Sequence, residues 1–181
     1  MRARAAIALG LWAAVLLARP GRARALEPEF QVKAEFMERF TRFIDWPAKA
    51  FVRATDPFVL CLAGKHPFGD YLDKMAKSRQ LKKRRLALRV VGAPEQVAGC
   101  HLLYVAASES KRVAALVAAA SGKAVLTVGD SAKFGEQGLI INFYLDGGNV
   151  RFELNLGAAG KSGLKLSSKL IRLGKLVGGK P

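Results

Sequence analysis

Two apolar segments near the end of the chain, residues 139–145 and 150–156, are separated by Asp-Gly-Gly-Asn at residues 146–149. Glycine adopts the positive φ angles of a tight hairpin turn at little cost, and two apolar runs joined by such a turn are typical of a β-hairpin. The spacing therefore predicts a hairpin here. Since a hairpin buries its apolar residues only against other elements, this prediction constrains the rest of the fold.

The second segment of the predicted hairpin has two different faces. Val150, Phe152 and Leu154 alternate with the polar residues Arg151, Glu153 and Asn155. A period of two places successive side chains on opposite faces of a strand. We expect one face to pack against the core and the other to be free to bind a ligand.

Four more short apolar runs predict strands, and the segments between them predict helices. The strands are expected at residues 58–63, 86–91, 101–106 and 124–128, and the helices at 27–44, 67–77, 109–120 and after a cap at Ser167. We expect Phe43 to face inward from the first helix, Pro47 to end it, and residues 79–85 to form a solvated loop or strand entry. Strands that alternate with helices favour a largely parallel sheet covered on both faces. The predicted fold is therefore an α/β three-layer sandwich with an antiparallel C-terminal hairpin.

The N-terminus has the pattern of a secretory signal peptide. Arg2 and Arg4 precede an apolar run at residues 5–18, and Ala23-Arg24-Ala25 is a small-residue cleavage site. The run is shorter than the roughly 20 residues that span a bilayer. We expect residues 1–25 to be removed, leaving residues 26–181 as one soluble domain in the bacterial periplasm.

The chain is strongly basic. Without the five arginines of residues 1–25, the 30 Lys and Arg fall to 25 against 14 Asp and Glu, a net charge of +11. Such a surface attracts nucleic acid, anionic lipid or an acidic protein, or it only keeps the protein soluble. Export makes nucleic acid the poorest of these partners.

The chain has two cysteines, Cys61 and Cys100. In an exported protein an even count favours a disulfide between them. The alternative is two buried thiols that behave as small apolar side chains.

Signals for catalysis are sparse. His66 and His101 lack the neighbours of a metal motif or a nucleophilic relay, so we expect no catalytic residue, metal or cofactor. The run at residues 157–162, Gly-Ala-Ala-Gly-Lys-Ser, ends like a phosphate-binding loop but has Asn155 where that motif needs its first glycine. The sequence therefore favours a protein that is not an enzyme.

Polar residues of the C-terminal region offer a candidate ligand site. Arg151, Glu153 and Asn155 are followed closely by Lys165, Ser167 and Lys169. A carboxylate beside ammonium and amide donors can hold a zwitterionic or anionic small molecule. The alternative is an ordinary exposed sheet face. Trp46, at the end of the first helix, either caps the core or lines a cleft.

Seven stretches in this order resemble the YfiR family of periplasmic regulators, over nearly all of residues 26–181. They are VKAEF with FIDWP (32–36, 43–47), FVLCLAG (58–64), CHLLYV (100–105), VLTVGD (125–130), GLIINF (138–143), VRFELN (150–155) and LKLSSKL (164–170).

The resemblance implies a homodimeric, non-enzymatic protein that binds the periplasmic domain of an inner-membrane diguanylate cyclase and represses it, limiting cyclic di-GMP and biofilm formation. It also implies small-molecule binding around Glu153, with Trp46, Asn155 and Lys165 as further candidates. The family's best studied member has two disulfides, whereas this chain has cysteines for one. The alternative function is a small-ligand or cell-wall binding module without a cyclase partner.

Overall fold

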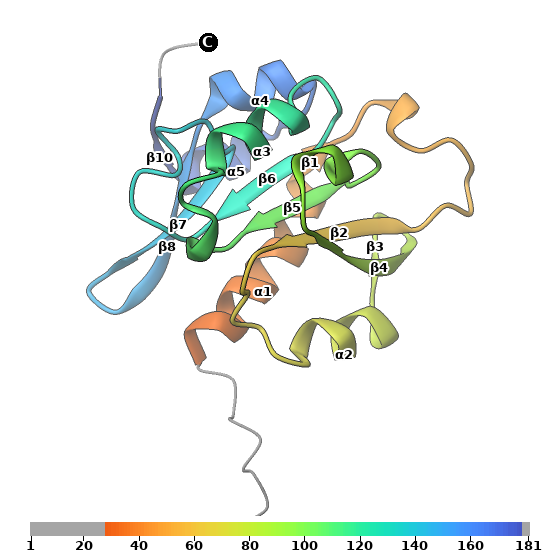
Figure 1. Cartoon of the computed structure of the whole chain (residues 1–181), viewed down its shortest axis with the longest axis horizontal. Coiled ribbons are helices and arrows are strands. Elements are labelled where there is room, and N and C mark those ends of the chain that lie inside the picture. Colours follow the sequence, from red (N-terminus) through yellow and green to blue (C-terminus); the bar gives the residue numbers. More distant parts are fainter. Residues whose placement is uncertain (1–27, 179–181) are drawn as a thin grey trace, which may run out of the picture.

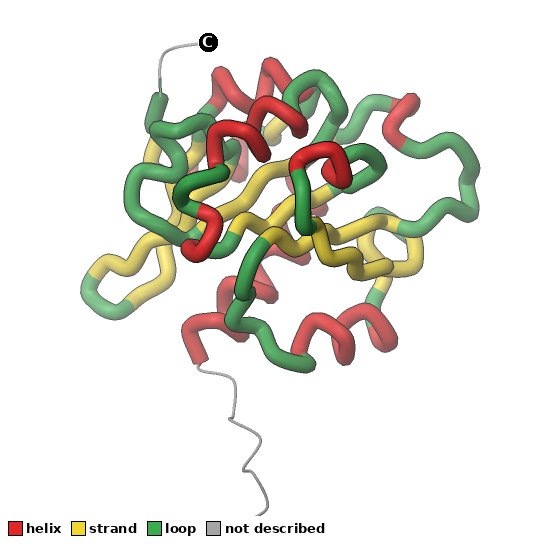
Figure 2. Tube along the Cα trace, in the orientation of Figure 1, coloured by secondary structure: helices red, strands yellow, loops and turns green. Residues whose placement is uncertain are grey.

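The computed structural model describes residues 28–178, so the expected signal peptide at residues 1–25 lies outside the described residues. The described chain forms a curled eight-stranded sheet with helices on both faces, plus a separate two-stranded sheet (Figure 1). Figure 2 shows the strands as a central layer between the helices. No helix within residues 28–178 is long and apolar enough to cross a membrane.

The helices and strands follow each other in the order expected of an α/β chain. The α-helices are α1 (Pro28–Phe40), α2 (Tyr71–Ser78), α3 (Val113–Ala120), α4 (Leu156–Ser162) and α5 (Ser168–Leu173). The strands are β1 (Ile44–Asp45), β2 (Phe58–Ala63), β3 (Gln80–Leu81), β4 (Arg84–Val91), β5 (Leu102–Val105), β6 (Leu126–Gly129), β7 (Ile141–Asp146), β8 (Asn149–Leu154), β9 (Lys165–Leu166) and β10 (Lys175–Leu176). All four predicted apolar strands and the hairpin are present.

The large sheet runs in the order β10-β8-β7-β6-β5-β2-β4-β3. Its centre, from β4 to β7, is parallel, whereas β8 pairs antiparallel with β7 and β3 antiparallel with β4. Strand β2 is buried on both sides: Phe58, Leu60 and Leu62 pack towards α1, and Cys61 and Ala63 pack towards α3. This arrangement confirms the predicted fold class.

Helix α1 fixes the position of the C-terminal hairpin. The ring of Phe40 lies 5.7 Å from that of Phe143 on β7 and 4.9 Å from that of Phe152 on β8. The turn between the strands is the predicted glycine pair, with φ angles of 56° at Gly147 and 80° at Gly148. Burial of these aromatic rings sets which face of the hairpin is left for polar residues.

The first helix is shorter than predicted. It ends at Phe40 and passes through the 3₁₀ turn Thr41–Phe43 into β1, which pairs antiparallel with β9. The predicted inward position of Phe43 is therefore wrong, since its side chain is exposed, and the helix ends well before Pro47. The competing interaction is long-range, because the Phe43 carbonyl accepts a hydrogen bond from Ser167 N at 2.9 Å.

Residues 79–85, expected as a loop or strand entry, form a hairpin in which β3 turns into β4 through Lys82 and Lys83. Both lysines have positive φ angles, 51° and 61°. This conformation disfavours residues with a Cβ, so local propensity does not predict the turn. Burial of Leu81 in the core stabilises it instead.

Three other helix predictions need different bounds. Helix α2 spans Tyr71–Ser78 instead of residues 67–77. Helix α3 begins at Val113, after a 3₁₀ turn at Ala107–Glu109, instead of at residue 109. Ser167 does cap α5, accepting a hydrogen bond from Leu170 N at 3.3 Å. That helix ends at Leu173, however, because Lys175–Leu176 pairs with β8 as an extra strand.

Candidate functional site

Glu153 lies on β8 and points to the face opposite Phe152 and Leu154. Its Oε2 accepts a hydrogen bond from Asn142 Nδ2 at 3.3 Å, and its Oε1 lies 3.6 Å from Lys175 Nζ. The side chain is 16% exposed. The structure therefore holds this carboxylate between an amide and an ammonium group, at the border between core and solvent.

Asn142 is a further candidate site residue, which the sequence reasoning missed. It lies on β7 directly opposite Glu153 and is buried. Its Oδ1 has no hydrogen-bond partner within residues 28–178. A buried acceptor without a partner is costly, so this atom can still accept a hydrogen bond from a donor group. The sequence signal that could have identified Asn142 is its position as a polar residue inside the apolar run of residues 139–143.

Asn155 does not continue the polar face of the strand. Strand β8 ends at Leu154, and Asn155 is the N-cap of α4, where its Oδ1 accepts from Ala158 N at 2.9 Å. Its Nδ2 donates to the Gly135 carbonyl at 3.0 Å. Because both ends of the amide are bonded internally, Asn155 fixes the start of the helix and the loop that covers Glu153.

The loop containing Gly135 lies between Glu153 and a cleft that Asn155 lines. A Cβ at Gly135 would lie 3.0 Å from Glu153 Oε2, so this glycine allows the close approach. On the other side, Asn155 lines a cleft of about 640 Å³ between the C-terminal end of α3, residues 136–138 and α4. Lys161 and Glu136 are its charged lining residues. The Gly-Ala-Ala-Gly-Lys-Ser run at residues 157–162, which ends like a phosphate-binding loop, lies inside helix α4.

Trp46 and Lys165 lie in a different region, around the small sheet of β1 and β9. Trp46 Nε1 donates to the His101 carbonyl at 3.3 Å, and its ring packs edge-on against Phe58 at 5.3 Å. Lys165 is exposed and pairs across the two strands with Asp45. None of these contacts involves Glu153 or Asn155, so the structure splits the four candidate ligand residues into two pairs.

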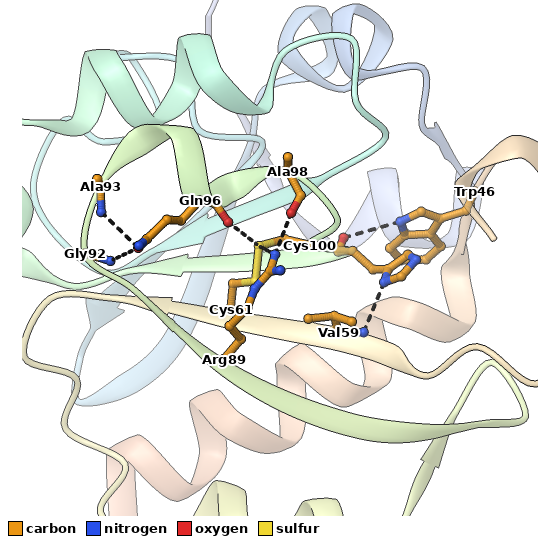
Figure 3. Close-up of a disulfide and its surroundings, with 10 residues drawn as sticks. Trp46, Val59, Cys61, Arg89, Gly92, Ala93, Gln96, Ala98 and Cys100 are labelled. Atoms are coloured by element: carbon orange, nitrogen blue, oxygen red, sulfur yellow. Dashed lines mark hydrogen bonds between the residues drawn. A yellow bond between two sulfur atoms is a disulfide. The ribbon is translucent and has the colours of Figure 1, made fainter. Parts of the chain in front are cut away.

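A disulfide joins Cys61 on β2 to Cys100 just before β5, with a Cα–Cα distance of 5.8 Å (Figure 3). Both sulfur atoms are buried. Arg89 lies opposite Cys61 in the strand register and donates from Nη2 to Cys100 Sγ at 3.0 Å and to the Ala98 carbonyl at 2.7 Å. The bond therefore ties the middle of the sheet to the turn that precedes β5.

Next to the disulfide, His101 is buried, and its ring contacts the backbone of two other segments. Its Nδ1 accepts from Val59 N at 3.0 Å, and its Nε2 lies 2.9 Å from the Ala50 carbonyl. The ring stacks on Phe51 at 4.3 Å. Burial is the main cause that holds the pKa of His101 below its usual range. Both ring nitrogens are thus occupied by backbone groups, which leaves neither free for acid–base chemistry.

Arg84 contacts the loop between β1 and β2 and packs on Phe51, the ring on which His101 also stacks. Its Nη1 donates to the carbonyls of Arg53, Ala54 and Asp56 at 2.8–2.9 Å, and its guanidinium lies 4.0 Å from the Phe51 ring centroid. The contact fixes the loop between β1 and β2. Within residues 28–178 no group of three His, Cys, Asp or Glu side chains is placed to hold a metal ion.

A family model described as YfiR/HmsC-like matches residues 30–175. No curated protein matches the chain. The match covers nearly all of the described residues, including β8 with Glu153, both cysteines and the β1–β9 sheet.

Proposed function

Because the chain belongs to the YfiR/HmsC-like family, we propose that it is a periplasmic regulator that binds the periplasmic domain of an inner-membrane diguanylate cyclase and represses it. The family match over residues 30–175 is the observation that carries this proposal. Repression would lower cyclic di-GMP and limit biofilm formation. The disulfide fits an oxidising compartment, as expected for an exported protein.

The contacts of the polar side chains support a binding role more than a catalytic one. Both nitrogens of His101 are used by backbone groups. The phosphate-loop-like run at residues 157–162 lies within a helix whose cap, Asn155, is bonded internally. A repressor needs only a higher affinity for the inactive state of its partner. A 100-fold preference corresponds to about 2.7 kcal/mol, which a modest interface can supply.

Deletion of the gene tests the proposal. Loss of the repressor should raise intracellular cyclic di-GMP and surface attachment, and an exported copy should reverse both. A copy that lacks residues 1–25 is the matched control, because it should stay in the cytoplasm and fail to restore repression. Unchanged cyclic di-GMP in the deletion strain under envelope stress would refute repression and favour the ligand- or cell-wall-binding alternative.

We also propose that Glu153 contributes to a site for a small zwitterionic or anionic molecule. The buried Oδ1 of Asn142, without a protein partner in residues 28–178, and the ammonium group of Lys175 flank its carboxylate. An acceptor, a carboxylate and a cation together can select a ligand that carries both charges. Asn155 supports this site through the Gly135 loop, whereas Trp46 and Lys165 would belong to a second contact region.

Glu153→Gln tests the ligand site without removing the side chain's shape. The change removes an ion pair whose lysine is well exposed, so the free energy of unfolding should fall by no more than about 1 kcal/mol. A thermal-shift panel of amino acids and small carboxylates should give a ligand that stabilises the unmodified protein and loses about tenfold in affinity with Glu153→Gln. Arg151→Gln, on the same face, is the control. Equal affinities for all three proteins would exclude Glu153 from the site.

A further inference from the structure

The outer edge of β4 is open over most of its length. Strand β3 covers only Arg84 and Arg85, whereas β4 continues to Val91 along β2 (Figure 1). Open strand edges are ready templates for an added strand, and proteins usually shorten or cover them. We therefore expect this edge either to pair with a strand of a partner or to be protected against such pairing.

The directions of the backbone hydrogen bonds of β2 show which backbone groups of β4 point away from the sheet. The carbonyls of Val59 and Ala63 accept from His101 N and Ala106 N, at 2.9 and 3.0 Å, so these residues of β2 point towards β5. The backbone groups of Leu60 and Leu62, which alternate with these residues, must then point towards β4.

By the same alternation, Arg89 directs its backbone groups to β2, and Leu88 and Val90 direct theirs away from the sheet. The hairpin register agrees, since Arg84 pairs outward with Leu81. Within residues 28–178, β4 has no strand partner beyond Arg85 on this side. Val90 is 71% exposed, so this end of β4 is open to solvent.

The chain segment that forms this edge is basic, although Lys82 is paired with Asp45 and Arg79 with Glu35. Between Arg79 and Pro94 the chain has six Lys and Arg and no Asp or Glu. Arg84, Arg85 and Arg89 lie on β4 itself, and Lys83 and Arg85 are exposed. Two copies paired edge to edge would place these cations opposite one another, and like charges across a strand pair are destabilising. Charge complementarity instead favours an acidic strand.

We propose that the open edge of β4 at residues 88–90 binds an extended, acidic segment of a partner protein as an additional strand. The backbone groups of Leu88 and Val90 would supply main-chain hydrogen bonds, and Lys83, Arg85 and Arg89 would supply the preference for acidic side chains. Identification of this partner as the regulated cyclase rests on the proposed function. The preference for an acidic strand does not, because it follows from the open backbone and the charges of the edge.

Val90→Pro tests the edge because it removes an amide that points outward and leaves the β2–β4 ladder intact. Val90→Thr keeps the amide and a β-branched side chain. Val150→Pro is the matched control, because in the β7–β8 register Val150 likewise points away from its partner strand, at the other end of the sheet. Circular dichroism and thermal melting should show that all three variants are folded.

The probe is an alternating Val-Glu octapeptide, followed by amide NMR shifts at residues 86–91, with a Val-Lys octapeptide as the charge control. The acidic peptide should shift these amides in the unmodified protein, Val90→Thr and Val150→Pro, and bind about tenfold more weakly to Val90→Pro. Equal binding to Val90→Pro, or equal binding of the Val-Lys peptide, would overturn the proposal. So would a dimer in sedimentation that only Val90→Pro converts to monomers, since a second copy would then occupy the edge. The assay is independent of cyclic di-GMP, so its failure and that of the proposed repression are distinguishable.

Discussion

Acid should destabilise this fold through His101. The side chain is 8% exposed, and Val59 N–H donates to its Nδ1 while the Ala50 carbonyl faces its Nε2. Only the neutral ring with its proton on Nε2 satisfies both contacts. A second proton on Nδ1 would turn a hydrogen bond with Val59 into a clash between two donors.

The direction of the pH dependence follows from the lowered pKa of His101. Burial is the largest cause; the Ala50 hydrogen bond and Asp56 oppose it, and the charges of Arg84 and Arg89 add to it. Since the unfolded chain takes up the proton first, this stabilisation is fully present above about pH 6.5 and is lost as pH falls towards the folded-state pKa. One proton limits the slope to about 1.4 kcal/mol per pH unit.

Urea unfolding at a series of pH values from about 7.5 to 5 measures the effect, and His101→Asn is the variant. Asparagine keeps an acceptor for Val59 N but loses the Ala50 contact and the stack on Phe51. The variant should lose about 1–3 kcal/mol at the upper pH and show a shallower decline towards pH 5.

His66 requires its own control. Burial also lowers its pKa, opposed by Asp73, so the two histidines act in the same direction. His66→Asn should therefore retain the His101 part of the slope. If unmodified protein and His101→Asn lost stability in parallel from pH 7.5 to about 5, His101 would not be the titrating group.

Three further changes test the packing. Replacing Cys61 and Cys100 by Ala should lower the free energy of unfolding by about 2–4 kcal/mol, and a reductant should lower the melting temperature of the unmodified protein but not of this variant. Phe40→Ala should cost about 3–5 kcal/mol in urea unfolding, because the ring lies between α1 and the hairpin; a loss below about 1 kcal/mol would contradict that position. Gly148→Ala should destabilise by about 1 kcal/mol because φ is 80°, whereas Gly160→Ala, in α4 with open space around its Cβ, should be neutral or stabilising; equal effects would refute the turn geometry.

Local sequence patterns were sufficient for the elements whose signals are local. The run at residues 58–63 is apolar throughout and forms β2 with those bounds. Gly147 and Gly148 predict the hairpin because the turn itself needs positive φ. With two cysteines in the chain, the pairing followed once a disulfide was assumed.

The turn from β3 to β4 could not be predicted in this way. Lys82 and Lys83 adopt positive φ against their own preference, so the stabilisation comes from elsewhere, through burial of Leu81 and pairing with β4. The end of α1 is similar, because Ile44 leaves the helical pattern to pair with Leu166, far away in the sequence. No local period contains such a contact.

The candidate site shows the same division. The alternation along β8 identified Glu153 as a polar residue on the face opposite Phe152, and the structure agrees. Only the fold shows that Asn142 lies opposite it with an unpartnered oxygen, and that Asn155 is a helix cap. Trp46 and Lys165 are separated from Glu153 because β1 and β9 pair with each other outside the large sheet. Sequence specified which side chains are polar, and the long-range strand pairing decided which of them meet.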